Sequence, residues 1–394
     1  GIVYRGSLHA GSLTGKYLFG DHNTKAIYAL NRPTGQAASA EYLTSVLRSG
    51  GTKRGLAGIS EGPDGEVYFL ELGDTGTNTG KIYKLVRTGE VVADPPKFLS
   101  QTGAFTNLST LSPRPGLLPF EVNSPLWSDG SQKQRWVAIP NNGTHNTAAE
   151  QVTYRETGSW DFPTGTVLVK HFALPIDERN PEITKPLETR FFVRGSNGVY
   201  YGLTYRWNEE GTDAELMTAG GSRQMTITQG DGTTRTQRWD FPSRADCRTC
   251  HTTSADNVLG LRSHQMARDF TYALTGRTSN QLETWDALGI FGASFGGRDP
   301  HSMPHAVDPH DPHASLDHRV KSYLGANCSH CHHPEGVAAN FDASFNVPLF
   351  AQGIIKGAIN FPINGPEDCV VEPGDTALSV MHARASVVGS GQMP

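Results

Sequence analysis

Two short cysteine-containing motifs hold the residues of this chain that are best suited to chemistry. Each motif joins two cysteines three positions apart to a histidine directly after the second: Cys247-Arg-Thr-Cys250-His251 and Cys328-Ser-His-Cys331-His332. Two thiols at this spacing can both add to the vinyl groups of one haem, and the next residue then offers its imidazole to the iron. Each motif therefore predicts one covalently bound haem c, with the histidine as its proximal ligand.

The same four cysteines also fit a zinc site or a pair of redox disulfides. A zinc site does not require a histidine after both second cysteines, and a thioredoxin-type motif needs a βαβ unit that this sequence lacks. Two haems c are therefore the preferred cofactors. Because haem is attached covalently outside the cytoplasm, we expect a periplasmic or extracellular bacterial protein. The fifth cysteine, Cys369, is expected to be a small buried thiol.

The iron of a c-type haem takes Met or His as its sixth ligand in electron transfer, or keeps that position open for chemistry. For the second haem we predict Met393, because Gly391-Gln392-Met393-Pro394 resembles the Met-Pro loop of small cytochromes c. Met381 is the alternative, although its helical surroundings favour core packing. A ligand so close to the last residue also suggests that the natural chain continues past Pro394.

For the first haem, several residues remain as candidates for the sixth ligand. His171, in Val169-Lys170-His171-Phe172, reaches the iron if the preceding β-region forms one wall of the haem pocket. Met303, which is closer in sequence to the first motif, is the second candidate, and Met266 and His264 are the further candidates. The other role open to His171 is that of a buried histidine hydrogen-bonded within a sheet.

Composition limits the size and the partners of the protein. Its 394 residues exceed one ordinary domain, so about two to four domains are expected. Glycine and proline number 44 and 24, which favours turns and short strands. A net charge of -5 offers no excess of Lys and Arg to neutralise phosphates, so we expect no nucleic-acid partner. No apolar run reaches the roughly 18 residues that span a bilayer, so we expect no transmembrane segment.

Residues 1–95 have the pattern of short strands separated by turns, at 16–21, 26–30, 65–70 and 81–85. Gly62-Pro63-Asp64-Gly65-Glu66-Val67-Tyr68 and Gly80-Lys81-Ile82-Tyr83 resemble the closing blades of quinoprotein sugar dehydrogenases of the soluble glucose and sorbosone dehydrogenase type. The resemblance implies a partial β-propeller, and the alternative is a small independent β-meander. The quinone-binding residues of that family lie in earlier blades, so PQQ is expected only if the missing blades exist elsewhere.

A partial blade cannot close a propeller, because each blade buries its faces against neighbours on both sides. We therefore expect one of two arrangements. Either this chain is the C-terminal part of a longer polypeptide, or an oligomer or companion chain completes the blade.

After residue 95 the sequence pattern changes twice. Residues 96–122 have the composition of a linker, and 123–242 that of an antiparallel β-sandwich with strands at 135–139, 165–172, 190–193, 199–205 and 224–228. Helical spacing follows at 263–273, 280–288 and 317–327, and a last helix is expected to begin at Asp375. We predict a first c-type haem domain over 243–316 and a second over 317–394.

The fold class predicted from these patterns is multidomain β plus α. It consists of a partial β-propeller blade and an antiparallel β-sandwich, followed by two small helical cytochrome c-like haem domains.

Residues 120–394 as a whole resemble a family of bacterial di-haem c-type cytochromes. The shared marks are Asn123-Ser124-Pro125-Leu126-Trp127-Ser128-Asp129-Gly130, Phe162-Pro163-x-Gly165-Thr166-Val167, Leu187-Glu188-Thr189-Arg190 and the two haem motifs, the second preceded by Tyr323-Leu324 and Asn327. The resemblance implies a β-domain ahead of two haems, and some longer members carry a propeller in front.

The leading functional hypothesis is a di-haem c-type cytochrome that transfers single electrons. It would accept them from a quinoprotein dehydrogenase module or another redox protein and pass them to an external acceptor, as the cytochrome part of an oxidoreductase; no catalytic residue is assigned. One alternative is a di-haem peroxidase or oxidase with one open iron, but the motifs are close together and no distal Glu, Gln or Arg constellation is recognised. Another is a sandwich that binds carbohydrate or a partner, with haems attached.

Overall fold

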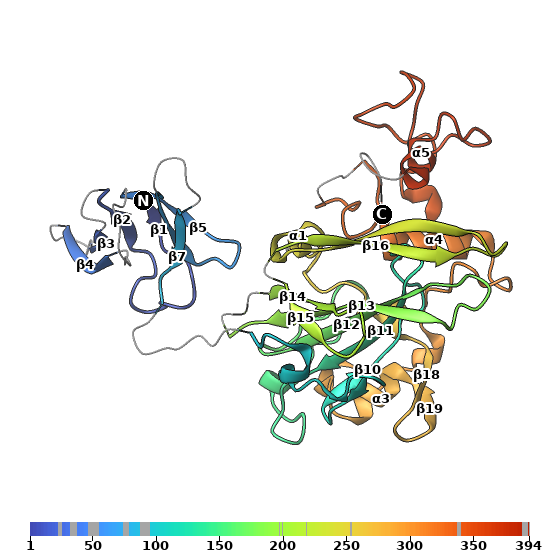
Figure 1. Ribbon diagram of the computed structural model, residues 1–394, viewed down its shortest axis with the longest axis horizontal. Helices are drawn as coiled ribbons and strands as arrows, with labels where there is room; N and C mark the ends of the chain where they lie inside the picture. The colour runs from blue at the N-terminus through green and yellow to red at the C-terminus, as the bar shows by residue number, and fades with distance from the viewer. Residues whose placement is uncertain are drawn as a thin grey trace. The chain divides into compact units, whose positions relative to one another are not determined.

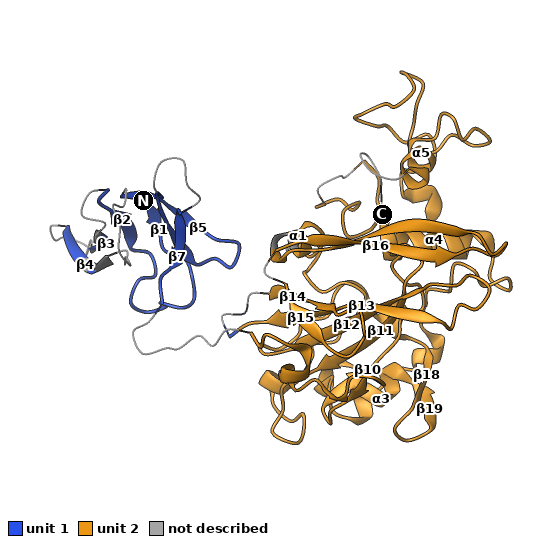
Figure 2. Ribbon diagram, in the orientation of Figure 1, with its two compact units in different colours: residues 1–94, 196–199 blue, residues 95–195, 200–394 orange. Residues whose placement is uncertain are grey.

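The computed structural model describes residues 1–22, 26–31, 38–45, 55–73, 79–86, 95–196, 198, 200–217, 219–252, 254–336, 340–387 and 393. The chain separates into two compact units, the first of residues 1–94 with 196–199 and the second of residues 95–195 with 200–394 (Figure 2). Both cysteine motifs belong to the second unit.

The first unit is built from two antiparallel sheets. One contains β1 (Ile2–Val3), β2 (Tyr17–Gly20), β3 (Ala26–Asn31) and β4 (Ser39–Ser45), and the other contains β5 (Leu56–Glu61), β6 (Val67–Glu71) and β7 (Lys81–Lys84). Leu18, Ile27 and Phe69 are buried in a common core. The buried Glu66 carboxylate accepts hydrogen bonds from the Tyr4 hydroxyl (2.6 Å) and the Leu8 backbone N–H (2.8 Å), which compensates its desolvation.

The second unit is centred on a six-stranded antiparallel sheet in which sequence neighbours are also spatial neighbours (Figure 1). Its strands are β10 (Leu117–Pro119), β11 (Gln132–Ala138), β12 (Val167–Pro175), β13 (Thr184–Arg194), β14 (Tyr200–Trp207) and β15 (Ala214–Leu216). Trp136, Val169 and Phe191 pack on one face with Leu99 and Phe105. These last two come from the expected linker, which carries the 3-10 helix η1 (Leu99–Thr102), β8 (Phe105–Asn107) and β9 (Ser112–Pro113).

Shorter elements complete the second unit, and several of them pack on the other face of this sheet. They are the hairpins β16 (Gly221–Thr228) with β17 (Thr234–Phe241) and β18 (Asp269–Tyr272) with β19 (Arg277–Asn280), and the helices α1 (Arg244–Cys250), α2 (Ser263–Met266), α3 (Gln281–Ala287), α4 (Leu316–Asn327) and α5 (Val380–Ser386). Trp285 of α3 and Met266 of α2 share one core with Val137 of β11 and with Trp160. Residues 258–303 are therefore built into the β-structure.

The predicted fold class is wrong. The described residues form several separate sheets with short helices and contain no closed barrel, no propeller and no pair of small helical haem domains. In place of a sandwich there is one six-stranded sheet with separate hairpins.

Two physical causes account for the missing helical domains. The helix expected at 263–273 ends at Met266, since Phe270, Thr271 and Tyr272 extend as β18 and pair with β19. Gly276 supplies the positive φ (66°) in the turn between the two strands. In addition, Val258 and Leu261, which follow the first motif, are buried in one core with Val137 of the sheet, so this stretch does not form a separate domain.

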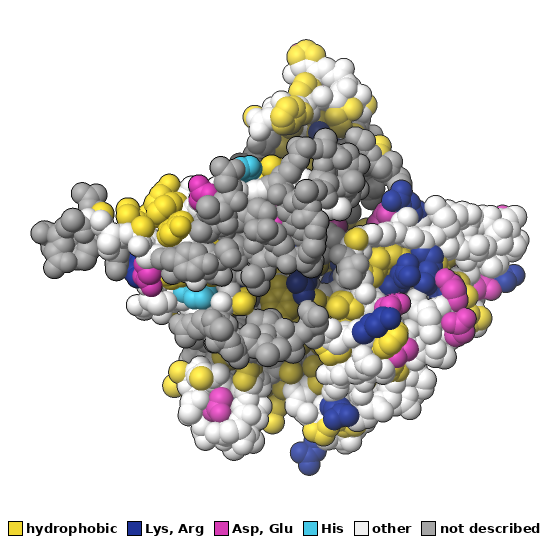
Figure 3. Space-filling model, turned by 60° about the vertical axis from the view of Figure 1, so that its left-hand side comes forward, with side chains coloured by type: hydrophobic (Ala, Val, Ile, Leu, Met, Phe, Trp, Pro, Cys, Tyr) yellow, Lys and Arg dark blue, Asp and Glu magenta, His cyan; other side chains and the backbone are white. Residues whose placement is uncertain are grey.

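Within the described part of the chain, no helix combines the length and the apolar character needed to cross a membrane. The face in Figure 3 carries Lys and Arg side chains interspersed with Asp and Glu side chains. Arg235 with Glu178 (3.2 Å) and Arg238 with Asp240 (2.7 Å) are ion pairs of this kind.

Candidate functional site

The first Cys-x-x-Cys-His motif lies on α1, whose start is fixed by a capping box. The Ser243 hydroxyl accepts from the backbone N–H of Asp246 (3.3 Å), and the Asp246 carboxylate accepts from the backbone N–H of Ser243 (2.8 Å). Cys247 and Cys250 are three residues apart and so share one face of the helix. Burial raises the pKa of both thiols above the usual value.

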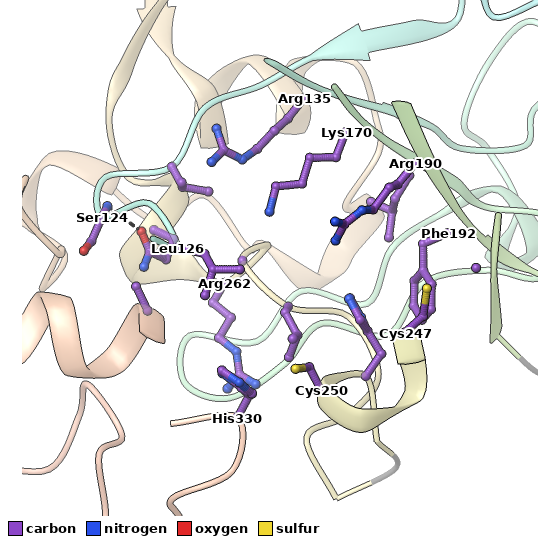
Figure 4. Close-up of a pocket in the computed structure, with 18 of the residues that line it drawn as sticks. Ser124, Leu126, Arg135, Lys170, Arg190, Phe192, Cys247, Cys250, Arg262 and His330 are labelled. Atoms are coloured by element: carbon purple, nitrogen blue, oxygen red, sulfur yellow. Dashed lines mark hydrogen bonds between the residues drawn. The ribbon is translucent and has the colours of Figure 1, made fainter. Parts of the chain in front are cut away.

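Both cysteines line a cavity of about 310 Å³ between α1 and the six-stranded sheet, here called the α1 cavity (Figure 4). This volume is within the range of small-molecule sites. Gly202 of β14 lets the helix approach the sheet, because a Cβ at that position would lie 2.6 Å from Cys247 Sγ. The sulfur is thus held directly against the backbone of a strand.

His251 follows the helix and also lines the α1 cavity. Its Nδ1 lies 2.6 Å from the carbonyl oxygen of Asn257, a residue with a positive φ of 61°. A carbonyl can only accept, so Nδ1 carries the ring proton and Nε2 is left as the basic nitrogen. Burial, with the charges of Lys170 and Arg190 adding to it, lowers the pKa of His251 to about 4. The neutral imidazole is the form that binds metals.

Three cations form a row across neighbouring strands on the sheet side of the cavity. Arg135 of β11 is the register partner of Lys170 of β12, and Lys170 is the register partner of Arg190 of β13. This cation row lines the α1 cavity, and Figure 4 shows the three side chains extending into the space in front of the sheet. Like charges directly opposite each other on a sheet are destabilising, so an anion bound beside the row would stabilise it.

Only one member of the cation row has a carboxylate partner among the described residues. Arg190 makes a two-pronged interaction with the buried Glu188 (2.9 and 2.6 Å), whereas Arg135 and Lys170 make no hydrogen bond or ion pair within that part of the chain. Burial lowers the pKa of Arg135 to about 10 and holds that of Lys170 well below its usual value. The cavity is therefore lined by two cations that lack a hydrogen-bonded or ion-paired carboxylate among the described residues, and also by two thiols and a basic imidazole nitrogen.

The second motif follows α4 and forms a single turn, in which the backbone N–H of His332 donates to the Cys328 carbonyl (2.8 Å). Cys328 packs against an apolar cluster made of Leu324, Ala343, Ile354 and Val370. The His332 ring is stacked on Phe341, with centroids 4.1 Å apart. The second motif thus has an apolar environment of its own.

The two motifs are neighbours within the second unit. Ser329 and His330, which stand between the second pair of cysteines, line the α1 cavity together with Gly325 and Ala326 of α4. The backbone N–H of Trp127 donates to the side-chain oxygen of Asn327 (2.6 Å), which ties the 123–130 loop to the residue before Cys328. Groups attached at the two motifs would therefore be close together.

Neither His171 nor Met303, the first two candidates for the sixth ligand of the first haem, lines the α1 cavity. His171 lies on the opposite face of the sheet, where its Nδ1 is 2.9 Å from the Thr189 hydroxyl and burial lowers its pKa to about 4. The Met303 sulfur accepts from the Tyr154 hydroxyl (3.3 Å) in the core around Trp160. Met393 is 40% exposed, and its neighbours Gln392 and Pro394 are outside the described residues.

Other candidates from the sequence do lie near the motifs. His264 of α2 lines the α1 cavity, where burial together with Arg262 and Lys321 lowers its pKa to about 3. Met381 packs against the same apolar cluster as Cys328. The cation row was not predicted from the sequence, although Arg135, Lys170 and Arg190 lie in three strands that the sequence did predict.

Among the described residues, the remaining reactive side chains form no further cluster of potential metal ligands. Cys369 is buried, and its thiol donates to the Glu372 carboxylate (3.6 Å). The described residues contain no group of three or more His, Cys, Asp and Glu side chains arranged to hold a metal ion, so the four motif cysteines are not gathered as a zinc site would need.

Comparisons with known protein families, with curated proteins and with solved structures found no match to this chain.

Proposed function

We propose that the protein is a di-haem c-type cytochrome that transfers single electrons. Cys247 and Cys250 would hold one haem, with His251 as its proximal ligand, and the corresponding residues of the second motif, Cys328, Cys331 and His332, would hold the other. When bound, the haems supply the one-electron chemistry. The chain's own residues fix the irons, exclude water and set the charge around them.

One observation carries this proposal: at the α1 cavity, two thiols and a basic imidazole nitrogen face a row of cations. A haem brings a vinyl pair for the thiols, an iron for the imidazole and two carboxylates for the cations. Lys170 and Arg135 lack an anion of their own among the described residues, so carboxylates placed there would remove the repulsion between them. The donor set therefore fits haem c in both chemistry and charge.

The closeness of the two motifs supports transfer of electrons between the haems inside one unit. We propose an external redox protein or dehydrogenase as donor, another protein as acceptor, and a periplasmic or extracellular location, as covalent haem attachment requires. The sequence resemblance to bacterial di-haem cytochromes adds to this proposal.

The test is to produce the protein in a bacterial periplasm that attaches haem c and to measure haem per chain by the pyridine haemochrome spectrum and intact mass. We expect two haems in the unaltered chain and one in each double variant, Cys247→Ser with Cys250→Ser or Cys328→Ser with Cys331→Ser. An unaltered chain that folds without covalent haem in this host would overturn the proposal. A protein that carries both haems with one high-spin iron would indicate the peroxidase class.

A further inference from the structure

His264 is held in place through its backbone and its ring face. Its carbonyl oxygen accepts from the side-chain amide of Asn123 (3.0 Å) and from the backbone N–H of Ala306 (2.8 Å). The next residue, Gln265, is held by the backbone N–H of Ser124, which donates to its side chain (2.8 Å). The ring is stacked on Phe345, with centroids 4.4 Å and planes 13° apart. The imidazole therefore has a fixed position on the wall of the α1 cavity.

No hydrogen bond to either ring nitrogen of His264 is found among the described residues. Most buried histidine rings have a hydrogen-bond partner, as His251 has in the Asn257 carbonyl and His171 in the Thr189 hydroxyl. An imidazole that lines a cavity without such a partner is available to a ligand in that cavity.

His264 and His251 lie on different walls of the α1 cavity. His251 directly follows the last residue of α1, and its ring contacts Phe192 of the sheet (4.2 Å between centroids). His264 stands on α2 beside α4, because its stacking partner Phe345 lies against Gly325, where a Cβ would be 3.1 Å from that side chain. Two imidazoles from different elements therefore line the same cavity.

We infer that an imidazole nitrogen of His264 is the sixth ligand of the iron at the first motif, which gives that haem two histidine ligands. This inference rests on the proposed function. Met266 is fully buried in the core around Trp160, and His171 and Met303 are engaged away from the cavity, so none of them competes. Besides His251 and His264, His330 also lines the cavity, so it is the rival candidate that the test must separate from His264.

The test compares His264→Ala, His264→Met and His330→Ala in the full chain, using haem content and near-infrared magnetic circular dichroism, which separates ligand sets. In His264→Ala we expect both haems to stay attached and one of the two to become high-spin and to bind CO when reduced. In His264→Met the two-histidine signal should disappear and a Met-to-iron charge-transfer band should be gained. His330→Ala should keep the unaltered spectrum.

The possible failures can be told apart. Absence of haem at Cys247 and Cys250 in the unaltered protein overturns the proposed function as well as this inference. If both haems remain low-spin in His264→Ala with unchanged spectra, only the assignment of His264 is overturned. A high-spin haem in His330→Ala would transfer the assignment to His330. The His264→Met variant keeps an iron ligand of similar size. It therefore separates loss of the ligand from a folding defect caused by the alanine.

Discussion

Lys170 is the central charge of the cation row and has no hydrogen bond or ion pair within the described residues. An oxidised haem carries one more positive charge than a reduced haem, so a nearby ammonium disfavours oxidation. We predict that Lys170→Gln lowers the midpoint potential of the first haem. At an effective dielectric of about 20 the loss is on the order of 1 kcal/mol, which is on the order of 40 mV for one electron. Spectroelectrochemical titration measures it.

The control for that titration is Lys97→Gln, which removes an exposed ammonium paired with Glu215 (3.2 Å). It should leave both potentials unchanged, because water screens an exposed charge. Equal potentials in Lys170→Gln and the unaltered protein would contradict the assigned role of the cation row.

Lys133 makes the haem-free chain sensitive to pH. Burial, with Arg135 and Arg190 adding to it, lowers the pKa of Lys133 from 10.5 to about 8. Between these two values the unfolded chain binds this proton more tightly than the folded chain, so stability rises with pH. We predict that a chain with all four motif cysteines changed to Ser gains stability from pH 8 to 10.5 relative to the same chain with Lys133→Gln. Urea unfolding across that range measures it, and parallel curves would refute the prediction.

Two methionine variants test the thioether ligand that we propose for the second haem. Met381 packs against the apolar cluster that also contacts Cys328, whereas Met393 is 40% exposed. We expect Met381→Leu to abolish the weak far-red band of a Met-to-iron bond and Met393→Leu to retain it. The opposite pattern would support Met393 as the ligand, as the sequence predicted.

At the residue scale, the two motifs predict the cysteines and proximal histidines of two haems, which stays a prediction, and the surroundings of these residues could not be predicted. Val169-Lys170-His171-Phe172 is a strand with apolar side chains on both faces. The order of apolar and polar residues therefore does not show which side chains point to which face of the sheet. The structure turns Lys170 toward the cavity and His171 away from it. The cation row depends on the register between three strands, which a single sequence does not specify.

At the scale of elements, the contact between α1 and β14 leaves no room for a side chain at Gly202. A methyl group there would meet the sulfur of Cys247 at 2.6 Å. We predict that Gly202→Ala destabilises the protein by about 1–3 kcal/mol, as overpacking does, and reduces haem attachment at the first motif. Haem content and urea unfolding measure both effects.

Gly230→Ala is the matched control, because a Cβ at Gly230 meets no atom within 4 Å. If both alanine variants keep full haem content and stability, α1 does not need its close approach to the sheet.

The elements themselves were predictable where the local pattern was strong. The strands expected at 135–139 and 165–172 are present as β11 and β12, and the helix expected at 317–327 is α4, capped by Ser315. The helix expected at 263–273 failed after Met266, where β-branched and aromatic residues pair with β19 instead. The core that joins Trp160 to Trp285 depends on contacts between distant segments, so no local pattern could reveal it.

At the scale of the whole molecule, both motifs and the sheet that faces them lie in one compact unit. We predict that residues 95–394 produced alone fold, receive two haems and give the absorption spectrum of the full chain. Haem content and thermal unfolding measure this. Loss of either haem on removal of residues 1–94 would mean that the first unit is needed to build the site.

The domain plan drawn from the sequence placed each motif in a helical domain of its own. The structure instead uses the sheet, α2 and the turn of the second motif as walls around the first motif. That arrangement could not be predicted, because the resemblance to known cytochromes indicated the order of segments and not which surfaces they share.

The wall contributed by Gly325, Ala326, Ser329 and His330 comes from the last fifth of the chain. If the protein is exported from its N-terminus, as the proposed location implies, the sheet and α1 reach the far side of the membrane before this wall does. The first pair of thiols would then be open to the haem-attaching machinery until α4 arrives and closes the cavity. A chain that ends before Leu316 should therefore still acquire haem at Cys247 and Cys250, but hold it open to solvent.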